Sequence, residues 1–120
     1  MLSIGKFSNI CRVSTKTLRY YAEIGLLLPS EVNPENGYRY YAIEQLETML
    51  FINRLKAYHF SLEEIGDILK SDSSEEQLYA VLSKKKQELE RQVQNTQDTL
   101  LQINTDMKTL MQGKSIMSFI

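Results

Sequence analysis

The sequence predicts a mostly α-helical protein, in which a small β-hairpin interrupts a set of short helices and one long coiled-coil helix follows them. Three observations predict this class. Two short helical patterns are separated by a three-residue turn, a segment rich in Pro, Gly and Tyr breaks the helical periodicity, and heptad spacing fills the last part of the chain. We therefore expect one domain over 1–72, a dimerisation coiled-coil helix over 74–112 and a tail or linker over 113–120.

Composition limits the classes of protein to consider. With 120 residues, of which 42% are hydrophobic and 24% are charged, the chain fits one soluble globular domain. No apolar run reaches the roughly 18 residues of a membrane span, and no signal peptide is visible, so we expect no membrane partner and a cytoplasmic location. Residues 1–58 carry seven Lys or Arg against five Asp or Glu, a mild positive balance in a chain of net charge −1.

The residues that most often build catalytic or metal sites are scarce. The chain contains a single cysteine, Cys11, and a single histidine, His59. One cysteine cannot form an intramolecular disulfide, and a soft-metal site needs several such ligands close together, so we expect no metal and no other cofactor. A glycine-rich phosphate loop and a convergent pair of acids are also missing, which argues against an enzyme.

The first two predicted helices are joined by the turn at 11–13. Ser3 is the expected N-cap of the first helix, and Ser14 that of the second, which ends near Ile24 before Gly25. Arg12 occupies a turn position where glycine is usual, so we expect some backbone strain there. The faces expected to pack where the two helices cross are formed by Ile4, Phe7, Ser8, Ile10, Val13, Leu18 and Tyr21.

A hairpin is predicted after the second helix. Asn36 and Gly37 both tolerate positive φ, which favours a tight two-residue turn between two short strands. On the outgoing strand, side-chain alternation places Tyr38 and Tyr40 on one face and Arg39 and Tyr41 on the other.

Two further short helices are expected before the long one. The first begins near Ile43 and has an apolar stripe at Leu46, Met49, Leu50 and Leu55. After a break at 58–60, Ser61 and Glu64 form a capping box that opens the second, and its expected buried face contains Leu62, Ile65, Ile68 and Leu69.

The long helix begins at a further capping pair, Ser74 and Gln77, and no Pro or Gly interrupts it before Gly113. At about 1.5 Å per residue it forms a rod on the order of 55 Å long, which needs a partner helix along its apolar stripe. Self-association is the favoured interpretation, and a helix lying along its own domain is the alternative. The predicted dimer seam, spaced alternately by four and three residues, contains Leu82, Lys86, Leu89, Val93, Thr96, Leu100, Ile103, Met107 and Leu110.

The arrangement of two helices and a hairpin has the outline of a winged helix-turn-helix, and its side chains suit double-stranded DNA. In such a unit the second helix enters the major groove, where its cationic side chains neutralise phosphates or reach a guanine edge. The residues expected to face DNA are Thr15, Lys16, Arg19 and Tyr20 on the helix, with Tyr38, Arg39 and Tyr40 on the hairpin. Tyr21 is as well explained by packing, and strands favour tyrosine for reasons unrelated to DNA.

Taken together, these segments resemble the MerR family of transcription regulators. The resemblance covers residues 3 to about 112 and is densest in "VSTKTLRYYAEIGLL", "NPENGYRYY" and "FSLEEIGDIL". It implies a homodimer joined by an antiparallel coiled coil, bound to a pseudo-palindromic promoter with a long spacer that it distorts for RNA polymerase. The DNA contacts that it implies are Lys16, Arg19, Tyr20, Tyr21, Tyr38 and Arg39, with Lys56 from a second wing as a weaker match.

The hairpin segment is closest to the branch of the family that responds to drugs and other organic effectors. Members of that branch carry a separate effector-binding domain after the coil, which leads us to expect either a DNA-binding part of a longer protein or a short regulator. Three positions depart from the family pattern: Ala22, Ala42 and His59. The operator, the effector and the sign of regulation cannot be read from the sequence, and a coiled-coil adaptor that binds protein instead of DNA is the alternative function.

Overall fold

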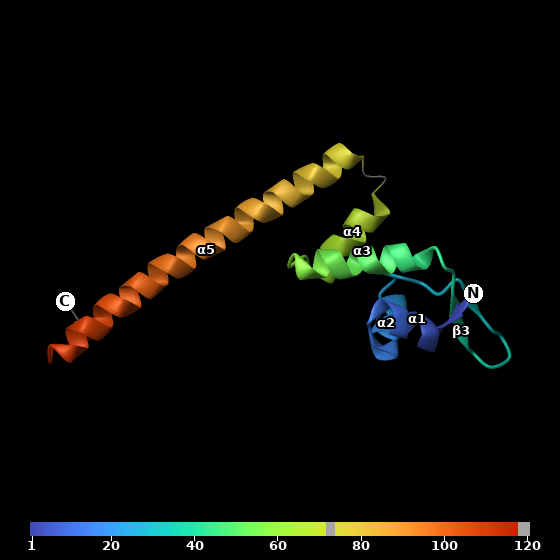
Figure 1. Ribbon diagram of the computed structural model, residues 1–120, viewed down its shortest axis with the longest axis horizontal. Helices are drawn as coiled ribbons and strands as arrows, with labels where there is room; N and C mark the ends of the chain where they lie inside the picture. Colours follow the sequence, from blue (N-terminus) through green and yellow to red (C-terminus); the bar gives the residue numbers. More distant parts are fainter. Residues whose placement is uncertain (72–73, 118–120) are drawn as a thin grey trace. The chain divides into compact units, whose positions relative to one another are not determined.

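The computed structural model describes residues 1–71 and 74–117, and the chain divides into two compact units, Met1–Asp72 and Ser73–Ile120 (Figure 1). The fold is mostly helical with a small antiparallel sheet and a long last helix, which confirms the predicted class. The first unit contains β1 (Leu2–Ser3), α1 (Ile4–Cys11), α2 (Thr15–Glu23), β2 (Glu31–Val32), β3 (Arg39–Tyr41), α3 (Gln45–Ala57) and α4 (Leu62–Lys70). The second unit contains α5 (Glu75–Met111).

The predicted helix caps of the first two helices are present. The Ser14 hydroxyl accepts a hydrogen bond from the backbone N–H of Thr17 at 2.9 Å, and the Ser3 hydroxyl accepts one from that of Lys6 at 3.3 Å. Each bond satisfies one of the amides that the first turn of a helix leaves without a partner. At its other end α1 stops because Arg12 adopts the left-handed conformation, with φ 56° and ψ 42°.

The left-handed Arg12 confirms the expected strain and leads to a stability prediction. An L-residue with a Cβ pays roughly 1 kcal/mol or more to adopt this conformation, and glycine does not. We expect Arg12→Gly to raise the free energy of unfolding by about 0.5–1 kcal/mol, measured by urea denaturation. Arg12→Ala is the matched control, since it removes the same charge but keeps the Cβ. Equal stability of the two variants would show that the backbone conformation is not the cause.

The sheet has the strand order β1–β3–β2, and both pairings are antiparallel. Its register places Val32 opposite Arg39, so the connecting loop spans 33–38, and the predicted two-residue turn is wrong. Two asparagine side chains hold the longer loop: Asn33 accepts from the backbone N–H of Glu35, and Asn36 from that of Tyr38, both at 2.9 Å. Strand β1 was not expected from the sequence, because two residues are too few to show alternation.

Helix α3 begins at Gln45, two residues later than expected. Ala42 offers no capping side chain, but the side-chain amide oxygen of Gln45 accepts a hydrogen bond from the backbone N–H of Ala42 at 2.9 Å. The side-chain nitrogen Nε2 of Gln45 also donates to the backbone carbonyl oxygen of Leu28 at 2.7 Å, which ties the start of α3 to the segment before β2. Of the predicted apolar stripe, Met49 and Leu55 are buried, but Leu50 is 56% exposed and that assignment was wrong.

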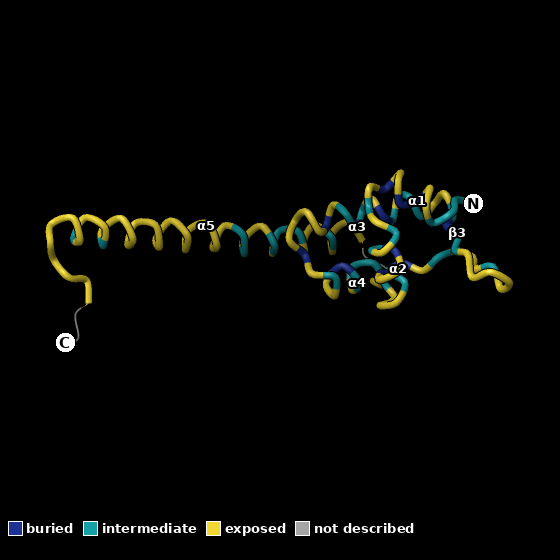
Figure 2. The backbone as a smooth tube through the Cα atoms, turned by 90° about the horizontal axis from the view of Figure 1, so that it is seen from below, coloured by how far each residue is buried: buried dark blue, intermediate teal, exposed yellow. Residues whose placement is uncertain are grey.

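The core of the first unit lies where α1, α2, α3 and β3 meet, and Figure 2 shows its buried segments. The rings of Phe7 and Tyr41 stack there with centroids 4.4 Å apart and planes 13° from parallel. Among the described residues, the largest fully buried side chains are Tyr21, Tyr41, Phe7, Leu18, Met49, Ile52, Leu55, Ile65 and Cys11. This core fixes α2 and β3 relative to each other, and both carry predicted DNA contacts.

Helix α4 begins at the predicted capping box. The Ser61 hydroxyl accepts from the Glu64 backbone N–H at 3.1 Å, and the Glu64 carboxylate accepts from the Ser61 N–H at 2.9 Å. The turn before it places His59 at φ 70°, a conformation that favours glycine, so the histidine at this position adopts a backbone conformation that costs a residue with a Cβ more than it costs glycine.

Helix α5 is 37 residues long and contains no buried residue in the isolated chain. Its N-cap is Ser74, whose hydroxyl accepts from the backbone N–H of Gln77 at 3.2 Å, as predicted. Apolar side chains along it stay open to water in the isolated chain, and Leu100, for example, is 55% exposed. Among residues 1–71 and 74–117, no helix combines the length and the apolar character needed to cross a membrane.

Candidate nucleic-acid interface

Helix α2 presents a cationic and aromatic face to solvent. Its inward side chains Leu18 and Tyr21 are fully buried, which fixes the rotation of the helix about its axis. On the opposite side Lys16, Arg19 and Tyr20 are exposed, and Thr15 is half-buried. The structure therefore places three of the predicted DNA-facing residues of this helix on its open surface.

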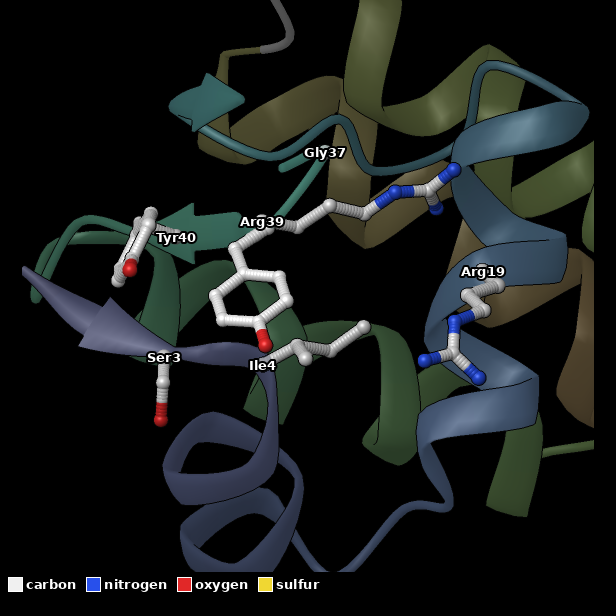
Figure 3. A pocket seen from close by; sticks show the side chains of 7 residues that line it. Ser3, Ile4, Arg19, Gly37, Arg39 and Tyr40 are labelled. Atoms are coloured by element: carbon white, nitrogen blue, oxygen red, sulfur yellow. The ribbon is translucent and has the colours of Figure 1, made fainter. Parts of the chain in front are cut away.

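The hairpin brings a second cation to the same region. Tyr38 is 64% exposed at the end of the 33–38 loop, and Arg39 and Tyr40 are half-buried on β3. Figure 3 shows the Arg39 side chain extending from β3 toward α2, the helix that carries Arg19. Both arginines line one pocket of about 310 Å³, which seven residues of the N-terminal strand, α1, α2 and the hairpin enclose. The structure thus joins two predicted contacts that lie 20 positions apart in the sequence.

The two arginines lack acidic partners. Within 1–71 and 74–117, no carboxylate forms a salt bridge with Arg19 or Arg39. Burial raises the pKa of the neighbouring Tyr41 hydroxyl, and the positive charges of Arg39 and Arg19 lower it in part. The charges of both arginines therefore act on the same buried hydroxyl, although burial has the larger effect on its pKa.

Tyr21 occupies a different place from the one that the resemblance implied. Only 1% of its surface is exposed, so its ring is part of the core and the prediction of direct DNA contact does not fit this structure. Its hydroxyl accepts a hydrogen bond from the Lys56 ammonium at 2.9 Å, and that nitrogen lies 5.6 Å from the ring centroid. Tyr21 therefore holds Lys56 in place, and Lys56 is exposed, so its role as a DNA contact stays a prediction.

The hydrogen bond between Tyr21 and Lys56 predicts that two Tyr→Phe substitutions will change the free energy of unfolding by different amounts. Tyr21→Phe keeps the ring but removes the acceptor for Lys56, and we expect it to lower the free energy of unfolding by about 1 kcal/mol. Tyr41→Phe is the matched control, because the buried Tyr41 hydroxyl has no hydrogen-bond partner and its removal should leave stability unchanged or slightly raised. Thermal denaturation measures both. Equal losses would contradict the special role of the Tyr21 hydroxyl.

The described residues offer no metal site. In 1–71 and 74–117, no three His, Cys, Asp or Glu side chains lie close enough together to hold an ion. Cys11 is buried at the end of α1, and burial raises the pKa of its thiol, which keeps it protonated and poorly reactive. Its backbone carbonyl accepts from the Asn53 side chain at 3.1 Å, a contact between the turn and α3 that the sequence pattern did not reveal.

These elements form a winged helix-turn-helix DNA-binding unit, with a capped recognition helix, a three-residue turn before it and a hairpin beside it. Each of the three carries cations that form no salt bridge with a described carboxylate. Comparison with known families agrees. Residues 2–72 match the model of the MerR HTH family regulatory protein, and residues 46–105 match the model described as MerR, DNA binding. The chain belongs to the MerR family of DNA-binding regulators.

Curated relatives are regulators as well, and none of those named here is an enzyme. The chain is 38% identical over 105 residues to the multidrug-efflux transporter 2 regulator of Bacillus subtilis, covering 88% of this chain and 36% of that protein. It is 36% identical over 113 residues to the transcriptional regulator BrlR of Pseudomonas aeruginosa, covering 92% of this chain and 42% of the relative. The chain thus spans about two-fifths or less of these relatives.

Solved structures show the same architecture. One is EcmrR bound to DNA in a complex named EcmrR-RPo, with a TM-score of 0.76, 37% identity, and coverage of 88% of this chain and 38% of that one. Another is the N-terminal part of MtaN, the Bacillus subtilis multidrug transporter activator, with a TM-score of 0.80 and 29% identity. The match covers 89% of this chain and 98% of that one.

Proposed function

We propose that two copies of this chain pair through α5 and bind a pseudo-palindromic promoter with a long spacer. Each copy places α2 in a major groove and its hairpin on the adjacent backbone. By holding two half-sites at a fixed separation, the dimer bends and untwists the spacer, which controls how RNA polymerase engages the promoter. Deforming DNA in this way takes energy, and contacts to the bent duplex supply it.

The observation that carries this proposal is the exposed face formed by Lys16, Arg19 and Tyr20, beside Arg39 of the hairpin. Long cationic side chains without acidic partners favour the phosphate backbone, and Arg and Lys are the side chains best suited to the guanine edge in the major groove. Lys56, held by Tyr21, adds a cation from the end of α3.

The exposed apolar stripe of α5 supports pairing with a second copy. Its predicted seam members alternate by four and three residues, as in left-handed coiled coils. The Thr96 hydroxyl donates to the carbonyl oxygen of Gln92 at 2.8 Å within its own helix, so this seam position presents no unpaired hydroxyl to a partner. The residues that we assign to the dimer interface are Leu82, Leu89, Val93, Thr96, Leu100, Ile103, Met107 and Leu110.

An organic effector is the proposed signal. A relative of this chain is named for a multidrug-efflux transporter that it regulates, and the chain aligns with 36% of that protein. We infer that a full-length form of this regulator responds to a small organic molecule through a domain outside the present residues.

Selection of genomic fragments by the purified chain, followed by sequencing, identifies the operator and tests the proposal. Affinity for that operator is then measured against salt concentration. Several phosphate contacts make log affinity fall with log salt at a slope of roughly 0.9 per phosphate neutralised. A shallow slope, or no enrichment of any duplex, would contradict DNA binding and favour a protein-binding adaptor.

A further inference from the structure

Asn53 of α3 binds the turn from which the recognition helix α2 begins. Its side-chain amide donates a hydrogen bond to the backbone carbonyl oxygen of Cys11, the last residue of α1, at 3.1 Å. We propose that Asn53 is a positioning residue, which sets the orientation of α2 and thereby the ability of the protein to distinguish its operator from other DNA. The inference rests on the proposed function and extends it to a side chain that binds the protein and not the DNA.

The first support is the strained geometry of the turn. Arg12 adopts the left-handed conformation at φ 56°, and the backbone N–H groups of Arg12 and Val13 both bind the carbonyl oxygen of Ser8. The Cys11 carbonyl lies at the end of α1, where the helix offers it no further amide. A residue keeps a sparsely populated conformation only when its surroundings determine that conformation. Asn53 supplies such a constraint, because it binds the peptide group that joins Cys11 to Arg12.

The second support is another contact from the same side of α3. Lys56 lies three residues after Asn53, so the two side chains share one face of the helix. The Lys56 ammonium donates to the hydroxyl of Tyr21, in the second half of α2, at 2.9 Å. Helix α3 therefore holds α2 at two points, one just before its start and one near its end. Two such points fix the direction of the helix axis, whereas one alone would let the helix pivot.

The orientation of α2 affects the two modes of DNA binding differently. Base readout in the major groove depends on hydrogen bonds of defined geometry, so it is sensitive to the direction of the helix. Binding to unrelated sequences depends mainly on phosphate charge, which tolerates a small change in direction. Loss of a positioning residue should therefore lower affinity for the operator and leave affinity for other duplexes almost unchanged.

Substitutions at Asn53 test this role. Asn53→Ala removes the donor, and Asn53→Leu removes it while keeping the branched shape of the side chain, which separates loss of the hydrogen bond from loss of packing. Ile52→Val is the matched control, since Ile52 is fully buried next to Asn53 in α3 and its shortening lowers stability without removing a polar contact. Affinity is measured at one salt concentration for the selected operator and for a random duplex of equal length. Thermal denaturation establishes a temperature at which every variant is folded.

We expect Asn53→Ala and Asn53→Leu each to bind the operator roughly fivefold to tenfold more weakly, and the random duplex less than about twofold more weakly. Ile52→Val should change both affinities by less than about twofold, because its loss of stability does not redirect α2. A ratio of operator to random affinity that stays unchanged in either Asn53 variant, or that falls as far in Ile52→Val, would overturn the positioning role while leaving DNA binding intact. Failure of the unmodified protein to enrich any duplex would instead refute the proposed function and the positioning role with it.

Discussion

Leu100→Asp should separate the α5-mediated dimer into monomers. Leu100 lies at the middle of the predicted seam, and a partner helix would bury it on pairing. An unpaired charge in such an interface costs about 3–5 kcal/mol, which corresponds to a rise in the dimer dissociation constant on the order of 100-fold or more. Sedimentation equilibrium at micromolar concentration measures the change in mass.

The adjacent residue provides the control. Leu101 is a leucine like Leu100 and is 68% exposed. It lies one position after Leu100 and outside the four-and-three spacing, so it points away from the predicted seam. Leu101→Asp should therefore leave the mass in solution unchanged. If both variants stay dimeric, or both become monomeric, the seam assignment is incorrect.

Arg19→Ala should weaken operator binding by roughly 10- to 100-fold, the usual cost of losing an arginine at a guanine edge or a phosphate. The reason is its position, because Arg19 is exposed on α2, has no acidic partner among the described residues, and lines the same pocket as Arg39 of the hairpin. A gel-shift or fluorescence-anisotropy titration at fixed salt measures the change.

A second variant shows whether Arg19 acts through a direct contact with DNA or only through the net charge of the protein. Lys108→Ala removes one positive charge from α5, outside the unit that carries the predicted DNA contacts, and should change affinity by less than about twofold at physiological salt, which screens exposed charges that do not contact the DNA. Both variants should remain dimeric. Comparable losses of affinity in the two variants would mean that Arg19 acts through net charge alone. Loss of the dimer in Arg19→Ala would also refute its assignment as a DNA contact.

Local signals in the sequence predicted most of the helical framework. Capping depends on a side chain and an amide about three residues apart, so Ser14 and Ser61 could be recognised directly, and the structure confirms both caps. The strained turn at Arg12 followed from the same local reasoning. The length of α5 was equally visible, because periodicity over many turns outweighs any single residue.

Features that depend on long-range contacts were predicted less well. The hairpin loop is longer than the Asn36–Gly37 pair suggested, because the register of β2 with β3 leaves 33–38 between the strands, and β3 also pairs with β1, far away in the sequence. Tyr21 matched a DNA-contact pattern, yet its ring faces the core and its hydroxyl binds Lys56, 35 positions away. The pocket that Arg19 and Arg39 both line also depends on the fold.

Footprinting on the selected operator tests the central claim most directly. If two winged units are held apart by a paired α5, hydroxyl-radical cleavage will show two protected half-sites related by an inverted repeat, on either side of a spacer with altered reactivity. Protection of a single half-site, or two direct repeats with an undistorted spacer, would contradict the proposal that a symmetric dimer grips and deforms the promoter.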